Sequence, residues 1–189
     1  MKLRWSLVVG LAIVSGAGCR TPPPPPAEPQ LLSTSTIKDI MHAMVEPSSN
    51  FLFDAVSEVS DKTGIHENAP KTDQEWDAVR RQALTLLEAQ NLVVMHGRKV
   101  AKPGEKSANS AVELEPEAIQ ALIDGDRVAF VTFASKLQDA TMVAMRAVDA
   151  KDKDALMAAG EGIDQACENC HLKYWYPNEK KVGEAAGKP

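Results

Sequence analysis

The sequence predicts an all-α protein, an antiparallel four-helix bundle whose most distinctive motif lies in its last helix. Apolar residues make up 44% of the chain but aromatic residues only 5%, and alanine is frequent among the apolar positions. This composition favours helices over strands. Four segments repeat apolar residues at helical spacing, and no alternating β-branched run or Asn-Gly hairpin turn is expected. Four helices with one long connection bury their apolar faces most simply as an antiparallel bundle.

The chain begins like an export signal. Lys2 and Arg4 precede a short apolar stretch over residues 7–14, and small residues follow at 15–18. The stretch is too short for a lasting membrane span. Cys19 then follows Gly-Ala-Gly, which resembles a bacterial lipoprotein processing site except that Gly16 replaces the usual aliphatic residue. We therefore predict a signal peptide over 1–18 and lipidation of Cys19, which would tether a periplasmic protein to a membrane. Cleavage by ordinary signal peptidase, which would give a free periplasmic protein, is the alternative.

A proline-rich linker is predicted over residues 19–33. The run from Pro22 to Pro26 should form extended polyproline II, because proline fixes φ and lacks an amide donor. The linker would act either as a stalk or as a simple disordered tail. The bundle itself is expected over 34–177, and a polar tail over 178–189.

The first two helices are predicted from apolar stripes and a capping signal. The first runs from about Thr34 to Asp61, with a kink at Pro47 because proline removes a backbone hydrogen bond and crowds the preceding turn. The second begins at the capping box formed by Thr72 and Glu75 and continues to about Val94. A loop rich in Lys, Gly, Pro, Ser and Asn follows over 99–109.

The last two helices follow that loop. Pro116 is suited to a first helical turn and opens a short prelude, which Gly125 interrupts before the main third helix continues to about Val148. Asp152 is a suitable N-cap for the fourth helix, which should run to about Trp175 before a proline two residues later stops it.

The strongest chemical signal is the motif Cys167-Glu168-Asn169-Cys170-His171 near the end of the fourth helix. Two thiols at this spacing, with an adjacent imidazole, suit covalent attachment of haem through two thioethers and ligation of its iron. On a helix, Cys167 and His171 share a face. A zinc site would need further ligands, and the other histidines are scattered. A dithiol redox site usually belongs to a thioredoxin-like βαβ context, which is not expected in this chain.

This motif in the last helix of an all-helical chain resembles class II c-type cytochromes, the cytochrome c′ family. The resemblance covers about residues 34–177 and includes the aromatic triplet 174–176. It implies an antiparallel four-helix bundle, one haem c bound through Cys167 and Cys170, and His171 as the proximal iron ligand. The family takes its distal residue from the first helix, and a methionine there gives six-coordinate iron that transfers electrons.

The distal candidates are Met41, Met44 and His42. Met41 lies on the apolar stripe of the first helix and best matches the place of the family's distal methionine. Met44 is also on the inner side, and His42 lies off the stripe. An iron with neither a methionine nor a histidine on its distal side is the remaining alternative, and a methionine on an apolar helix face is often only a core residue.

The predicted function is that of an exported mono-haem electron carrier rather than an enzyme. A gas-binding haem protein with an open distal site and a dithiol or zinc module are the alternatives. The formal charge of −5 argues against nucleic acid, which requires a basic surface. The expected partners are redox proteins, and a homodimer is possible for this family.

Overall fold

The chain is predominantly helical, as predicted. The computed structural model describes residues 31–177, so the predicted export signal, Cys19, most of the predicted proline-rich linker and the predicted polar tail lie outside the described residues. No helix in this described part has both the length and the apolar character needed to cross a membrane. The elements, in chain order, are α1 (Ile37–Ile40), the π-helix η1 (Met41–Val45), α2 (Glu46–Ala55), β1 (Ser57–Asp61), β2 (Gly64–Asn68), α3 (Asp73–Val93), α4 (Pro116–Gly125), α5 (Arg127–Asp149) and α6 (Lys153–Tyr174).

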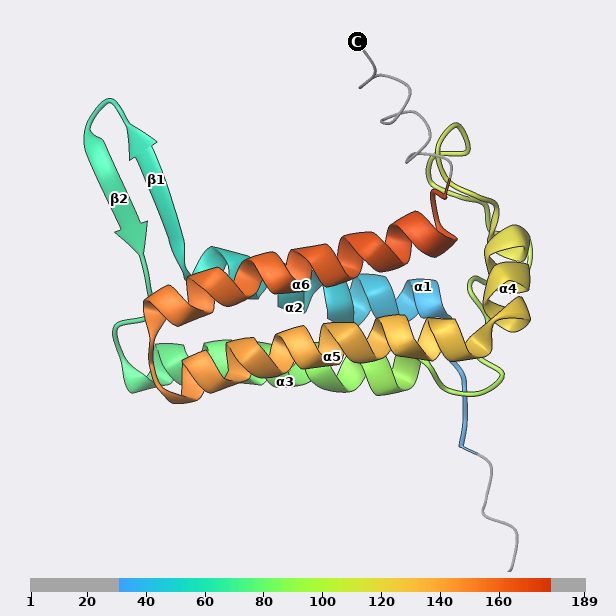
Figure 1. Cartoon of the computed structure of the whole chain (residues 1–189), viewed down its shortest axis with the longest axis horizontal. Helices are drawn as coiled ribbons and strands as arrows, with labels where there is room; N and C mark the ends of the chain where they lie inside the picture. Colours follow the sequence, from blue (N-terminus) through green and yellow to red (C-terminus); the bar gives the residue numbers. More distant parts are fainter. Residues whose placement is uncertain (1–30, 178–189) are drawn as a thin grey trace, which may run out of the picture. The chain divides into compact units, whose positions relative to one another are not determined.

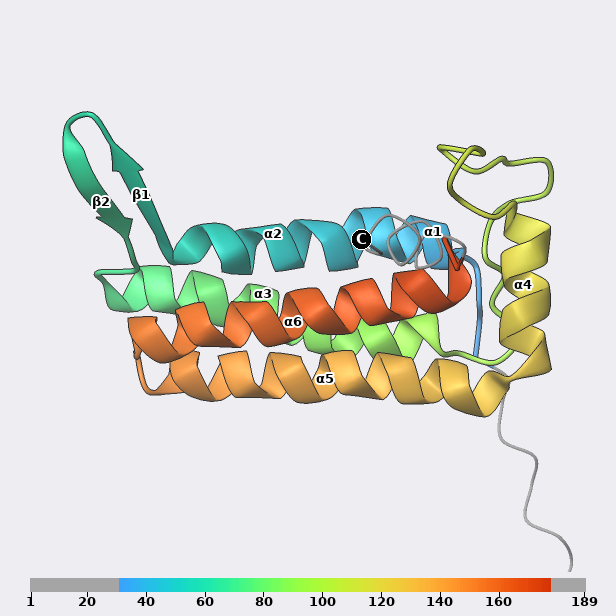
Figure 2. The same cartoon turned by 45° about the horizontal axis from the view of Figure 1, so that its top comes forward.

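The long helices lie side by side. In both Figure 1 and Figure 2, α2, α3, α5 and α6 lie along a common axis, with the hairpin β1–β2 at one end and α4 at the other. The most extensive packing joins α5 to α6 and α3 to α5, and α2 packs on α3. By comparison, α2 and α6 make little direct contact along their lengths. The seam between these two helices is therefore packed less closely than the α2–α3, α3–α5 and α5–α6 seams.

The buried core follows the apolar stripes of these helices. Leu86 on α3, Phe130 on α5 and Ile163 on α6 are almost fully buried, and Ile37 joins them from α1. Burial of apolar side chains of this size contributes about 1.5–3 kcal/mol each. The core therefore holds the helices that carry the candidate site residues in fixed positions.

The predicted starts of three helices are confirmed. Thr72 and Glu75 make both hydrogen bonds of the predicted capping box at the start of α3. The Asp152 side chain accepts hydrogen bonds from the first-turn amides of α6, and Pro116 opens α4. These caps satisfy amide groups that would otherwise lack partners at the helix N-termini.

The first predicted helix is wrong beyond Ala55. The chain leaves the helix at Val56, which has an extended backbone, and forms an antiparallel hairpin in which Asp61 pairs with Gly64. Gly64 has φ +131, a conformation that other residues rarely adopt. The segment is also rich in poor helix formers, such as Ser, Asp and Gly, so nothing local sustains the helix. The prediction of an entirely helical fold is therefore wrong for this segment, which forms a hairpin without an Asn-Gly turn.

The irregularity expected at Pro47 takes the form of a π-helix. The Glu46 amide donates to the Met41 carbonyl, a bond that spans five residues instead of four. Buried Ile37 and Ile40 precede this turn, and buried Leu52 follows it. A regular α-helix turns by about 100° per residue. Without the π turn, the face of Leu52 would therefore be rotated by about one residue from the face of Ile37 and Ile40. The extra residue of the π turn lets both faces point into the core.

Candidate functional site

Both cysteines of the motif and its histidine face one cavity. The cavity has a volume of about 450 Å³ and lies between α6, α5, the α1–η1–α2 segment and the loop after α3. This volume is within the range of about 300–1,000 Å³ typical of sites for small molecules and cofactors. Cys167, Cys170 and His171 line it from α6. The helical spacing of the motif therefore brings Cys167 and His171 to a common wall, and Cys170 lines the same wall beside them.

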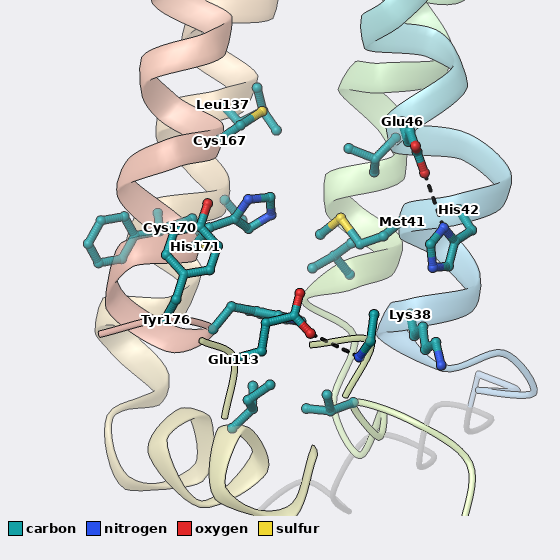
Figure 3. Close-up of a pocket in the computed structure, with 18 of the residues that line it drawn as sticks. Lys38, Met41, His42, Glu46, Glu113, Leu137, Cys167, Cys170, His171 and Tyr176 are labelled. Atoms are coloured by element: carbon teal, nitrogen blue, oxygen red, sulfur yellow. Dashed lines mark hydrogen bonds and ion pairs between the residues drawn. The ribbon is translucent and has the colours of Figure 1, made fainter. Parts of the chain in front are cut away.

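The opposite wall carries Met41. It lines the same cavity from η1, and Figure 3 shows Met41 and His171 pointing toward one another from the two sides of the pocket. Val45 lies on the same wall one turn later. A thioether and an imidazole facing each other across an apolar space can serve as the two axial ligands of one haem iron.

The structure separates Met41 from the two other distal candidates. Met44 packs against the core but does not line the cavity. The π turn explains this difference, because it gives Val45 the buried position that a continuous α-helical stripe would give to Met44. His42 does line the cavity, but its side chain is 67% exposed, and its Nδ1 lies 3.1 Å from Glu46 Oε2.

Most other side chains around the cavity are apolar. Phe130, Phe133 and Leu137 line it from α5, and Leu114 lines it from the loop that precedes α4. Such walls suit a large flat apolar cofactor, because they exclude water from both of its faces. The residues present therefore fit a haem in donor chemistry, volume and lining.

The loop between α3 and α4 supplies a wall that the sequence did not predict. The Leu114 amide donates to the Trp175 carbonyl at 2.7 Å, which ties this loop to the end of α6. At its other end, the amides of Ile37 and Lys38 donate to the carbonyls of Lys99 and Val100. The loop composition indicated only irregular structure, and no local signal revealed these long-range hydrogen bonds.

The environment of the motif favours neutral side chains. Burial raises the pKa of Cys167 to about 11, with a smaller contribution from the charge of Asp164. Burial also raises the pKa of Cys170 to about 12. The pKa of His171 is lowered, again mainly by burial. At neutral pH the imidazole therefore keeps the lone pair that a metal ligand needs, whereas the thiols lack the thiolate character of reactive dithiol sites.

Within residues 31–177, no group of three or more His, Cys, Asp or Glu side chains is arranged to hold a metal ion. This finding concerns sites built from protein ligands alone. A haem iron takes four of its ligands from the porphyrin, so it requires only one or two axial side chains from the protein.

Comparison with known proteins adds no relative. No protein-family model matches the chain, and no curated protein and no solved structure matches it either. The residues and the geometry of the site are therefore the basis for inferring a function.

Proposed function

We propose that the chain is an exported c-type cytochrome of the class II kind, an antiparallel four-helix bundle that binds one haem covalently and carries electrons. The observation that carries this proposal is the common cavity of Cys167, Cys170 and His171, with Met41 on the facing wall. A contiguous motif and a residue more than a hundred positions away thus meet at one site of suitable size.

Each residue has a defined role in this proposal. Cys167 and Cys170 would hold the haem as thioethers, and the neutral imidazole of His171 would ligate its iron. Met41 would supply its thioether sulfur as the second protein ligand of the iron, a donor that favours reduced iron and raises the potential. Phe130, together with the other apolar side chains of the cavity, excludes water. When bound, haem supplies a one-electron centre that alternates between Fe(III) and Fe(II).

The dithiol alternative is supported less well. Thiol–disulfide exchange requires a thiolate, and the pKa of Cys167 and that of Cys170 both lie well above neutral pH. The cavity beside these thiols also has no role in simple dithiol exchange, whereas a covalent haem requires it.

The cellular setting belongs to the same proposal. The segment 1–18 would direct export, and Cys19 would carry a lipid anchor, so the carrier would act at the periplasmic face of a membrane. Its partners would be other redox proteins. Metabolic labelling with a fatty acid tests the anchor: label should be retained in the full chain and lost in Cys19→Ala.

Expression with a haem-maturation system, followed by oxidised and reduced spectra with and without carbon monoxide, tests the function. We expect covalent haem with a low-spin reduced spectrum that carbon monoxide leaves unchanged. A high-spin spectrum that changes on addition of carbon monoxide would instead support the gas-binding alternative. Absence of covalent haem would exclude both haem functions.

A further inference from the structure

Two aromatic rings lie against the candidate iron ligand. The imidazole of His171 has its ring centroid 5.8 Å from that of Trp175 and 5.9 Å from that of Tyr176, the latter in an edge arrangement with an interplanar angle of 62°. A histidine that ligates a metal is usually oriented by a hydrogen bond from its second ring nitrogen. Among the described residues, no hydrogen bond reaches the His171 ring, so ring packing is the contact that can orient it.

Of the two aromatic residues, Tyr176 is held by a side-chain hydrogen bond as well as by a backbone hydrogen bond. Helix α6 ends at Tyr174, so Tyr176 lies beyond the regular helical backbone. Its amide donates to the His171 carbonyl at 3.1 Å, and its phenol donates to Glu168 Oε2 at 2.8 Å. A hydrogen bond to a carboxylate is about twice as strong as one between neutral groups.

Glu168 is well placed to act on the site without facing it. It occupies one of the two positions between the cysteines, and its side chain is exposed rather than part of the cavity lining. Its carboxylate therefore cannot ligate an iron in the cavity, but it can hold the Tyr176 ring against the imidazole edge.

We propose that Tyr176 is a positioning residue for His171 and that Glu168 holds Tyr176 in place. This inference rests on the proposed function, because it assigns His171 to the iron. The inference also assigns a role to Glu168, which lies between the two cysteines. Covalent attachment of haem by itself places no requirement on the residue at this position. The ring orientation of the proximal ligand would then depend on this hydrogen bond outside the cavity.

The test is the iron–histidine stretching band in the resonance Raman spectrum of the reduced holoprotein, measured in a Met41→Ala background so that the iron is five-coordinate. Tyr176→Phe removes only the hydroxyl group that Glu168 accepts from, and we expect it to broaden and shift the band. Tyr176→Ala should cause a larger shift. Glu168→Gln keeps an acceptor oxygen and should preserve the band, whereas Glu168→Ala should reproduce the effect of Tyr176→Phe.

Tyr174→Phe is the matched control, because it removes a hydroxyl group two residues away that has no hydrogen-bond partner among the described residues. Its band should equal that of the unsubstituted protein. The positioning role is contradicted if Tyr176→Phe and Tyr176→Ala leave the band unchanged in a protein that binds haem. If the unsubstituted chain forms no covalent haem, both this role and the proposed function are wrong.

Discussion

The two walls of the cavity differ in how the chain builds them. The α6 wall presents three chemical groups from five consecutive residues on a regular helix, so their relation depends only on helical geometry. The facing wall presents Met41 from a π turn, and its direction depends on how the two flanking helical segments pack. A contiguous motif on a helix can therefore be located from sequence, whereas a ligand supplied by another helix also depends on local irregularities.

The largest expected effect comes from the α6 wall. Cys167→Ser combined with Cys170→Ser should abolish covalent attachment, because neither thiol of the motif remains to form a thioether. Mass spectrometry of the matured chain under denaturing conditions should then show no added mass of haem. Single substitutions should each leave at most one thioether. Retention of covalent haem in the double variant would place the attachment elsewhere.

Separate substitutions of Met41 and Met44 compare a methionine that lines the cavity with one that packs only against the core. Met41→Ala should convert the low-spin iron fully to a high-spin form that binds carbon monoxide, because it removes the sixth ligand. Met44→Ala removes a side chain of the same size that is also half-buried but should leave the spectrum low-spin. Optical spectra of both reduced variants check this prediction. A spectral change confined to Met44→Ala would reverse the assignment.

The raised pKa of both thiols predicts slow alkylation in the haem-free chain. Only the thiolate reacts, and the pKa is about 11 for Cys167 and about 12 for Cys170. Compared with an ordinary thiol pKa of about 8.5, alkylation at pH 8 should be slower by a factor on the order of 100 or more. The rate should rise as pH increases through these values. Equal rates at pH 8 in the native chain and in a urea-unfolded control would contradict the burial of these groups.

The smallest effect is expected from His42. Its ring is exposed and pairs with Glu46, and exposed pairs of this kind contribute about 0–1 kcal/mol. His42→Ala should therefore change the free energy of unfolding by less than about 1 kcal/mol and leave the spectrum of the holoprotein low-spin. Chemical denaturation and an optical spectrum measure both. A loss of the low-spin spectrum would show that His42 rather than Met41 completes the iron site.

Much of the helical structure could be predicted because local signals agreed with the tertiary packing. The caps at Thr72 and Asp152 are satisfied within a few residues, and the apolar stripes of α3, α5 and α6 keep one phase throughout. The sequence does not reveal the hairpin, because its turn, Lys62-Thr63, lacks the usual Asn-Gly signal. The apolar residues before the turn also keep helical spacing through Val56.

The site could be predicted only in part, because some of its walls depend on tertiary packing. The apolar stripe favours Met41 over Met44, but the π turn that contains both residues depends on the burial of Ile37 before it and of Leu52 after it. The loop wall at Leu114 depends on a hydrogen bond to Trp175, which is sixty-one positions away. Such contacts arise from the tertiary packing and have no local pattern in the sequence.

The central claim is that His171 and Met41, on opposite walls, share one haem iron. X-ray absorption at the iron edge of the matured protein, in both oxidation states, tests this claim directly. We predict one sulfur scatterer and one axial imidazole in the unsubstituted protein, and loss of the sulfur alone in Met41→Ala. Absence of sulfur from the unsubstituted protein, or its persistence in Met41→Ala, would contradict the account.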